Sequence, residues 1–296
     1  MQTQRQIQEL LAAAGVSPNR RLGQHFLVDL NLMRLLVEAA QMERRDVILE
    51  VGAGTGSLTE ALAEQAGHVV TVEMDRTLAG IAQSRLAGAA NVELINTDVL
   101  SGKGALAPAV VEAVTRARAR LAGRLLLVSN LPYDVASSVM VNLVKGPLIA
   151  DAMTVTVQKE VARRMTAAPG TRNYGTLSIY LGATGDVEML RVLKPSVFWP
   201  PPGVESALVR YVRDERKSGR IPDMELFGRV VALFLGHRRK MLRACLKQAP
   251  PDLGGRGQWL EIFARTALDP TRRPEELSPA QYVDLANACR QLLRTS

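Results

Sequence analysis

The sequence predicts an α/β fold with a seven-stranded, mostly parallel sheet, followed by a small all-α domain. Two observations support this prediction. Short apolar runs rich in Val, Ile and Leu alternate with segments of helical periodicity as far as Val212, which is typical of a parallel sheet covered by helices. Beyond Val212 only helical patterns follow. With 296 residues, of which 47% are hydrophobic, the chain can form one large domain and a smaller one.

The expected strands are residues 47–51, 68–73, 92–96, 125–129, 153–158, 186–192 and 205–212. The expected helices between them are residues 57–64, 76–86, 106–120, 135–144, 159–165 and 174–181. A further helix over residues 30–40, capped by Asp29, precedes the sheet. Residues 194–203 carry four prolines and leave no room for a crossover helix. We therefore expect the last two strands to be antiparallel neighbours.

The C-terminal part begins after a polar stretch, residues 213–220, which has the composition of a linker and is soon followed by Pro222. Four helical patterns come next, over residues 224–235, 239–246, 258–266 and 279–293. The sequence therefore predicts one domain over residues 1–214 and a second over residues 215–296.

The composition indicates which kind of partner and which cellular environment suit the chain. The formal net charge is +8, and residues 217–296 alone hold 14 Lys/Arg against 8 Asp/Glu. Such an excess favours a polyanionic partner, although an ordinary solvated surface would carry it too. Cys245 and Cys289 allow at most one disulfide and have no His or Cys at zinc-ligand spacing. No metal site, membrane span or secretory signal is expected, which favours the reducing cytoplasm.

Candidate functional residues gather where the first four strands end. The run from Gly52 to Ser57 follows the first strand, and its glycines let the backbone approach a ligand. Glu73 ends the second strand, where it can accept hydrogen bonds from ribose hydroxyls, and Asp98 follows the third. Nicotinamide dehydrogenases share part of this pattern, and Asp98 alone would also suit a turn. In a parallel sheet, however, these positions open onto one edge, where ligands bind.

The fourth strand is followed by Asn130-Leu131-Pro132-Tyr133. Taken alone, this run would also suit a turn before a helix. Its residue types suit methyl transfer to the exocyclic amine of adenine, a poor nucleophile that no side-chain base simply deprotonates. The side-chain oxygen of Asn130 and the carbonyl of Leu131 or Pro132 can accept hydrogen bonds from that amine and free its lone pair. Tyr133 can stack on a base that has been extruded from its helix.

The chain closely resembles the ribosomal RNA adenine dimethyltransferase family, in particular its bacterial small-subunit (16S) members. The resemblance runs from about Arg20 to the C-terminus and includes the following motifs: Arg21-Leu22-Gly23-Gln24-His25-Phe26-Leu27, Glu50-Val51-Gly52-Ala53-Gly54-Thr55-Gly56, Asn130-Leu131-Pro132-Tyr133, Gln158-Lys159-Glu160-Val161-Ala162-Arg163-Arg164, Tyr174-Gly175-Thr176-Leu177-Ser178, Phe198-Trp199-Pro200-Pro201-Pro202-Gly203-Val204-Glu205-Ser206 and His237-Arg238-Arg239-Lys240. This likeness implies a Rossmann-like methyltransferase domain over residues 1–214 and a helical domain that binds RNA or the ribosome over residues 215–296.

The resemblance also implies S-adenosylmethionine as the methyl donor. The residues that it assigns to the donor are His25, Leu27, Gly52, Gly54, Glu73, Asp98 and Asn130. His25 stands where many relatives carry Asn. Phe198 matches the second aromatic platform of the family, opposite Tyr133, although it would also suit a hydrophobic plug between two strands.

The implied target is a pair of adjacent adenosines in the hairpin loop near the 3′ end of 16S rRNA, dimethylated at N6 within immature 30S subunits by a monomeric enzyme. Arg238, Arg239, Lys240 and Arg243 would place cations at helical spacing on one RNA-binding surface. Three alternatives remain open: a large-subunit RNA dimethyltransferase of the macrolide-resistance type, an N6-adenine DNA methyltransferase, and a non-catalytic assembly or transcription factor with the same fold. The Arg21-Leu22-Gly23-Gln24 run favours the small-subunit branch, and a Pro-Pro motif common in DNA methyltransferases is absent from residues 130–133.

Overall fold

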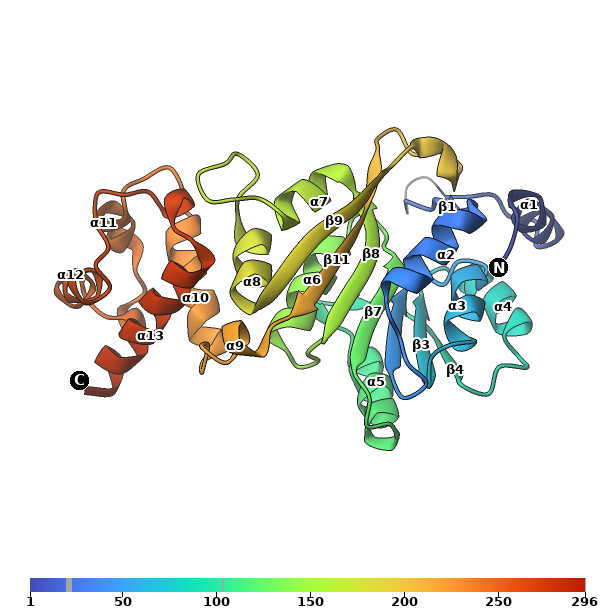
Figure 1. Ribbon diagram of the computed structural model, residues 1–296, viewed down its shortest axis with the longest axis horizontal. Coiled ribbons are helices and arrows are strands. Elements are labelled where there is room, and N and C mark those ends of the chain that lie inside the picture. Colours follow the sequence, from blue (N-terminus) through green and yellow to red (C-terminus); the bar gives the residue numbers. More distant parts are fainter. Residues whose placement is uncertain (20–22, 103, 296) are drawn as a thin grey trace. The chain divides into compact units, whose positions relative to one another are not determined.

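The computed structural model describes residues 1–19, 23–102 and 104–295, and Figure 1 labels its helices and several of its strands. Arg20, Arg21 and Leu22, where the resemblance begins, lie outside the described residues. By packing, the chain divides into two compact units. The first contains residues 1–162 and 188–212, and the second contains residues 163–187 and 213–296.

The first unit is built on a seven-stranded sheet with the order β4-β3-β2-β7-β8-β11-β9. The bounds of these strands are β2 (Val47–Val51), β3 (His68–Glu73), β4 (Val92–Asn96), β7 (Leu125–Asn130), β8 (Ala152–Gln158), β9 (Gly185–Leu193) and β11 (Ser206–Arg213). Strands β4, β3, β2, β7 and β8 are parallel, whereas β11 pairs antiparallel with β8. The predicted strands are thus confirmed to within one residue at each end, and the last two are neighbours in the sheet.

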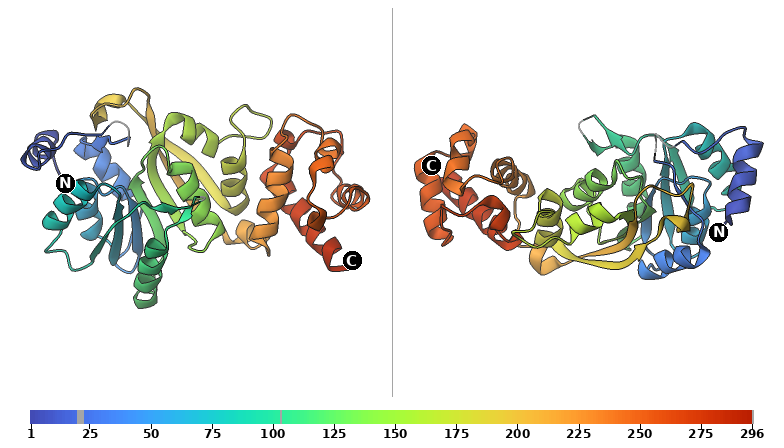
Figure 2. Two further views of the ribbon diagram at one scale, coloured as in Figure 1. Left: turned by 180° about the vertical axis from the view of Figure 1, so that it is seen from behind. Right: turned by 90° about the horizontal axis from the view of Figure 1, so that it is seen from above.

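Helices lie on both faces of this sheet (Figure 2). They are α2 (Leu30–Ala39), α3 (Ser57–Ala63), α4 (Arg76–Arg85), α5 (Pro108–Arg120) and α6 (Ala136–Lys145). A further helix, α7 (Lys159–Met165), follows β8 directly. Because both faces are covered, all five residues of β2 are buried, which explains its uninterrupted apolar run. Asp29 caps α2 as expected, since its carboxylate accepts hydrogen bonds from the backbone of Asn31 and Leu32.

Several short elements of the first unit escaped the sequence analysis. An N-terminal helix, α1 (Gln4–Ala13), begins with a capping box formed by Thr3 and Gln6. Strands β1 (Phe26–Leu27) and β10 (Phe198–Trp199) pair antiparallel in a small separate sheet. Strands β5 (Leu100–Ser101) and β6 (Ala105–Leu106) form an antiparallel hairpin. Because Leu106 belongs to β6, the helix predicted over residues 106–120 begins only at Pro108, as α5.

The second unit is helical. It contains α8 (Thr176–Thr184), α9 (Glu215–Ser218), α10 (Met224–Leu235), α11 (Leu242–Cys245), α12 (Arg256–Arg265) and α13 (Pro279–Thr295). Part of its core is an aromatic cluster in which Phe234 lies edge-on to Trp259, with ring centroids 5.2 Å apart. Among the described residues, none of the helices has the length and apolar character needed to cross a membrane.

Two expectations for this part of the chain were wrong. The stretch predicted as a linker continues β11 to Arg213 and then forms α9, because the Asp214 carboxylate caps that helix through the backbone N–H groups of Arg216 and Lys217. The helix predicted over residues 239–246 shrinks to α11, and residues 237–240 form turns instead.

The packing boundary also differs from the predicted one, because residues 163–187 group with the C-terminal helices. Tyr180 of α8 packs edge-on against Phe227 of α10, with ring centroids 5.4 Å apart. Gly228 lies next to the same tyrosine, and a Cβ there would clash with the Tyr180 hydroxyl. The assignment of methyl transfer to residues 1–214 and of RNA or ribosome binding to residues 215–296 stays a prediction.

Candidate active site

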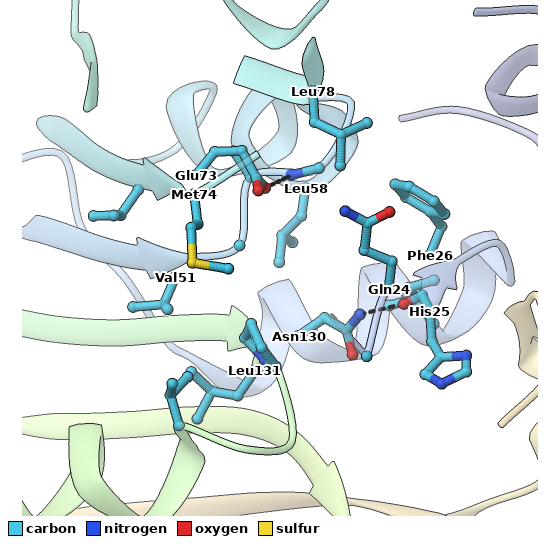
Figure 3. A pocket seen from close by; sticks show the side chains of 18 of the residues that line it. Gln24, His25, Phe26, Val51, Leu58, Glu73, Met74, Leu78, Asn130 and Leu131 are labelled. Atoms are coloured by element: carbon cyan, nitrogen blue, oxygen red, sulfur yellow. Dashed lines mark hydrogen bonds between the residues drawn. The ribbon is translucent and has the colours of Figure 1, made fainter. Parts of the chain in front are cut away.

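A cavity of about 250 Å³ opens at the carboxyl edge of the parallel strands in the first unit. Every donor-site residue predicted from the sequence lines it: His25, Leu27, Gly52, Gly54, Glu73, Asp98 and Asn130. Leu131, Pro132 and Tyr133 complete the wall on the β7 side. Figure 3 shows Glu73 and Asn130 on opposite sides of the cavity, with Gln24 and His25 near Asn130. The structure therefore brings together residues that are more than 100 positions apart in the sequence, as expected for ligand binding at the end of a parallel sheet.

The Gly-rich turn after β2 needs its glycines. Gly52, Gly54 and Gly56 all have positive φ angles, of 89°, 57° and 81°, which disfavour any residue with a side chain. Space is also limited at Gly52, because a Cβ there would lie 3.3 Å from Cγ of Pro132. Pro132 of the Asn-Leu-Pro-Tyr run thus packs directly against the turn. The two motifs form adjoining walls of one cavity.

Glu73 holds this turn in place from the end of β3. Its two carboxylate oxygens accept hydrogen bonds from the backbone N–H groups of Gly54, at 2.8 Å, and Asp75, at 2.9 Å. Burial raises the pKa of Glu73, and these hydrogen bonds oppose the increase. Each carboxylate oxygen retains acceptor capacity, so that the same group can also bind ribose hydroxyls.

Glu50 is a buried acid beneath the turn to which the sequence analysis gave no role. Its carboxylate accepts hydrogen bonds of 2.6 Å from the hydroxyl groups of Thr59 and Thr71. Complete burial raises the pKa of Glu50 to about 7, against the opposing effect of these two hydrogen bonds. Glu50 joins β2 to α3 and β3. The signal that could have found it is a charged residue within an otherwise apolar strand.

Asp98 is exposed in the loop after β4 and lines the cavity. Its side chain also accepts a hydrogen bond of 2.9 Å from the backbone of Leu100. Asp98 therefore stabilises a local turn at the wall of the cavity, and its contact with a donor stays a prediction.

The Asn-Leu-Pro-Tyr segment is fixed by β8 and β11. The backbone N–H of Leu131 donates to the carbonyl of Thr156, and the hydroxyls of Tyr133 and Ser206 lie 2.8 Å apart. Burial raises the pKa of Tyr133, so that its phenol stays protonated at neutral pH. The Asn130 amide donates to the backbone carbonyl of His25 at 2.9 Å (Figure 3). Asn130 and Tyr133 are thus held by residues that lie far from them in the sequence.

The ring that faces Tyr133 belongs to His25. The two rings are stacked, with centroids 5.6 Å apart. Nδ1 of His25 lies 2.7 Å from the carbonyl oxygen of Pro200, and because a carbonyl only accepts, this nitrogen carries the proton. That contact anchors the imidazole beside the cavity.

The structure corrects the expected placement of Phe198. Its ring is 2% exposed, belongs to the hydrophobic core and does not line the cavity. The physical reason is the pairing of β1 with β10, which sets Phe198 opposite Leu27. In this structure Phe198 is a plug between strands, and it does not form a platform opposite Tyr133.

Comparison with known proteins identifies the family. The family model described as "Ribosomal RNA adenine dimethylase" matches residues 15–291. The chain belongs to the ribosomal RNA adenine dimethylase family. Family membership makes it an S-adenosylmethionine-dependent rRNA (adenine-N6,N6)-dimethyltransferase. The Gly-rich turn, the acid at the end of β3 and the acceptors after β7 form a cavity whose chemistry fits this donor.

Curated relatives match nearly the whole chain. The chain is 36% identical to "Ribosomal RNA small subunit methyltransferase A" of Pelotomaculum thermopropionicum, over 95% of each protein. It is 37% identical to the protein of the same name from Phenylobacterium zucineum, over 95% of this chain and 92% of that protein.

Two solved structures share the fold. A dimethyladenosine transferase from Plasmodium falciparum has a TM-score of 0.69 and 21% identity, over 88% of this chain and 96% of that one. The 23S rRNA methyltransferase ErmE has a TM-score of 0.61 and 23% identity, over 90% of this chain and all of that one. The predicted Rossmann-like methyltransferase fold is confirmed.

The N-terminal helix, outside the segment matched by the family model, also contributes to the dimethylase cavity. Ile7 of α1 lines it and packs with Leu78 and Phe26. Gln2 is buried, and its backbone N–H donates to the hydroxyl of Ser57 at 2.7 Å. This contribution was not predicted, although the capping box of Thr3 and Gln6 could have revealed the helix.

The cations predicted to bind RNA lie in the second unit, and the structure changes the expected arrangement. They are not spaced along one helix, because residues 237–240 form turns and only Arg243 belongs to α11. Arg239, Lys240 and Arg243 are exposed. Arg238 is half-buried, forms a 2.8 Å ion pair with Glu275 and donates to the backbone carbonyl of Arg172. The guanidinium of Arg238 is therefore bonded to groups of the second unit itself.

Proposed function

We propose that this dimethyltransferase methylates N6 of two adjacent adenosines in the 3′-terminal hairpin loop of 16S rRNA, within immature 30S subunits. The observation that carries the proposal is the common cavity of Glu73, Asp98 and the segment from Asn130 to Tyr133. The names of the curated relatives support the small subunit as the target. A large-subunit target is not favoured, because the likeness to ErmE is 23% in sequence and concerns the fold.

In this proposal, the side of the cavity formed at the ends of β2, β3 and β4 binds the methyl donor. S-adenosylmethionine supplies a methyl group made electrophilic by its positive sulfur. In this proposal, the backbone at Gly52 and Gly54 approaches the methionine part of the donor, Glu73 accepts hydrogen bonds from its ribose, and Asp98 lies near its adenine. His25 and Leu27 line the same cavity from the loop and strand that precede α2.

The side of the cavity formed by the segment after β7 binds the target adenine in this proposal. The amine of adenine donates to the Asn130 side-chain oxygen and to the carbonyl of Leu131 or Pro132, which favours a pyramidal nitrogen with a free lone pair. Leu131 suits this role because its own N–H is already bonded to Thr156, which fixes the direction of the segment. As the new N–C bond forms, the sulfur–methyl bond breaks, and the amine proton leaves to solvent.

Tyr133 provides a face for the target base in this proposal. Base stacking on an aromatic ring contributes roughly 1–3 kcal/mol per base. In this structure His25 occupies the space beside that ring. The base therefore enters by displacing or joining the imidazole. A second platform role for Phe198 requires that β10 release its ring from the core.

The exposed cations Arg239, Lys240 and Arg243 are proposed to contact RNA phosphates, which sets the position of the enzyme on the particle without reading sequence. We further propose that the enzyme acts as a monomer in the cytoplasm, where assembling ribosomal subunits are found.

Methylation of immature, unmethylated 30S particles with labelled donor, followed by mapping of the modified nucleotides, tests this function. We expect two adjacent dimethyladenosines in the 3′-terminal hairpin of 16S rRNA. No label in the 30S particles, with transfer to unmethylated 23S rRNA supplied in a parallel reaction, would support the macrolide-resistance type of activity. Binding to 30S particles without transfer of label, by a folded protein that binds the donor, would support a non-catalytic assembly factor.

A further inference from the structure

The amide of Asn130 is held at both ends. Its nitrogen donates to the carbonyl of His25 at 2.9 Å, and its oxygen accepts from the hydroxyl of Thr156 at 2.5 Å. The backbone carbonyl of His25 can only accept, so that the amino end of the amide must face it. The amide oxygen therefore faces Thr156, whose hydroxyl must act as the donor. These two contacts define the orientation of the side chain.

Thr156 occupies the position next to Asn130 in the sheet. The two residues are direct partners in the parallel register of β7 and β8. The backbone carbonyl of Thr156 also accepts the N–H of Leu131, at 3.1 Å. Thr156 thus contacts two successive residues of the Asn-Leu-Pro-Tyr segment, one through its backbone and one through its side chain. Replacement of the side chain removes only the second contact.

The burial of Thr156 limits what it can do. Its exposed fraction is 0%, and it does not line the cavity, so the hydroxyl cannot touch a substrate. A buried hydroxyl costs free energy unless it is hydrogen-bonded, and its partner here is the side chain of Asn130. A branched side chain in a strand also has few rotamers, which fixes the direction of this hydrogen bond.

We infer that Thr156 is a positioning residue for methyl transfer, because its hydroxyl fixes the orientation in which the Asn130 oxygen presents its second lone pair to the target amine. This inference rests on the acceptor role of Asn130 in the proposed function. An amide oxygen has two acceptor directions, and Thr156 occupies one of them. Without this hydroxyl, the amide can rotate away from the productive direction while Asn130 itself remains in place.

Three variants separate orientation from packing. Thr156→Val removes the hydroxyl with little change in shape, and Thr156→Ser restores a hydroxyl. Thr154→Val is the matched control, because Thr154 is equally buried on the same face of β8 but is the register partner of Val128. The measurements are the single-turnover methyl-transfer rate on immature 30S particles, the donor affinity by calorimetry and the midpoint of thermal unfolding.

We expect Thr156→Val to lower the transfer rate roughly 5- to 20-fold, on the scale of one oriented hydrogen bond, with donor affinity unchanged. Thr156→Ser should recover most of the rate, and Thr154→Val should transfer at the wild-type rate. In an Asn130→Ala background, Thr156→Val should cause no further loss, because its effect passes through the missing amide. A wild-type rate for Thr156→Val, an equal loss in Thr154→Val, or a further loss in the Asn130→Ala background would each overturn the inference.

A second measurement does not depend on activity. The side-chain amide of Asn130 gives a pair of ¹⁵N–¹H resonances, which can be assigned by their absence in Asn130→Ala. We expect Thr156→Val to shift this pair and Thr154→Val to leave it in place. An unmoved pair in folded Thr156→Val would contradict the inference even if the wild-type protein transferred no methyl group. The absence of transfer by the wild type would instead count against the proposed function.

Discussion

The backbone N–H of Gly54 donates to Oε2 of Glu73 at 2.8 Å, so that the Gly-rich turn and the acid at the end of β3 form one hydrogen-bonded unit. The other carboxylate oxygen holds the backbone of Asp75, which is the N-cap of α4. Glu73 therefore has a structural task in addition to the ribose contact proposed for it. A test of donor binding must separate these two tasks.

Glu73→Gln should weaken donor binding by roughly 1–3 kcal/mol, the scale of lost hydrogen bonds to a charged group. Glutamine keeps one oxygen acceptor and nearly the same shape, so the turn is disturbed less than by alanine. Glu73→Ala should bind the donor at least as weakly and also unfold at a lower temperature, because two backbone N–H groups lose their partner.

Isothermal calorimetry with S-adenosylmethionine measures the first effect, and thermal unfolding measures the second. Glu64→Gln, a change at the exposed C-cap of α3, is the control for the loss of one negative charge. Unchanged donor affinity in a folded Glu73→Gln protein would remove Glu73 from the donor site.

Variants of Tyr133 should separate base capture from chemistry. Tyr133→Ala removes the stacking face, so the apparent affinity for the particle substrate and the transfer rate should both fall. Tyr133→Phe keeps the ring but leaves the buried hydroxyl of Ser206 without its partner, so we expect most of the activity to remain and a small loss of stability. Methyl-transfer kinetics on 30S particles would contradict this role if Tyr133→Phe were as damaged as Tyr133→Ala.

The exposed cations of the second unit should contribute to particle binding. Reversal of Arg239, Lys240 and Arg243 to Glu should weaken association with 30S particles and reduce its dependence on salt, while donor binding stays normal. Particle binding measured over a series of salt concentrations checks this. Association indistinguishable from wild type at every salt concentration would rule out this surface.

Arg238 should behave differently from these three residues. Because its guanidinium pairs with Glu275 and bonds the carbonyl of Arg172, Arg238→Ala should lower the free energy of unfolding of the second unit by about 1 kcal/mol. Thermal unfolding of Arg238→Ala beside Arg239→Ala, with the exposed residue as control, makes the comparison. Equal midpoints for the two variants would show that the ion pair does not stabilise the fold.

The pH dependence of stability should contain a contribution from Glu50. Burial raises the pKa of Glu50 from its ordinary value of 4.5 to about 7. Between these two values the folded protein binds more protons at Glu50 than the unfolded chain, so stability falls as the pH rises. Above about pH 7, burial of the charged carboxylate costs on the order of 3 kcal/mol.

Glu50→Gln should therefore flatten the decline of the free energy of unfolding between about pH 5 and 7. Denaturant unfolding at several pH values measures this, with the exposed Glu64→Gln as control. The buried Glu73 contributes in the same direction, so part of the decline should remain. A decline as steep in Glu50→Gln as in the wild type would show that Glu50 titrates at its ordinary pKa.

Much of the first unit follows directly from the sequence. The strands are apolar because both faces of the sheet are covered, and this makes runs such as residues 47–51 visible without a structure. Many of the residues that line the cavity could be found for a related reason. Parallel strands end at one edge, so that residues after β2, β3, β4 and β7 must meet there.

What escaped the sequence analysis depends on tertiary contacts. The burial of Phe198 results from the two-residue pairing of β1 with β10, which is too short to leave a periodic pattern. The role of Thr156 depends on its register with Asn130, 26 positions earlier, and buried threonine is common in strands. The pairing of Arg238 with Glu275 likewise joins segments 37 positions apart, so the motif alone could not separate Arg238 from its exposed neighbours.

The central claim is that Asn130 accepts the target amine and thereby promotes methyl transfer. It is tested most directly by the single-turnover rate of Asn130→Ala on immature 30S particles at saturating donor. We predict a rate lower by about 10²–10³, the scale of a lost hydrogen bond in the transition state, with folding and particle binding preserved. An Asn130→Ala protein that methylates both adenosines at the wild-type rate would contradict the account.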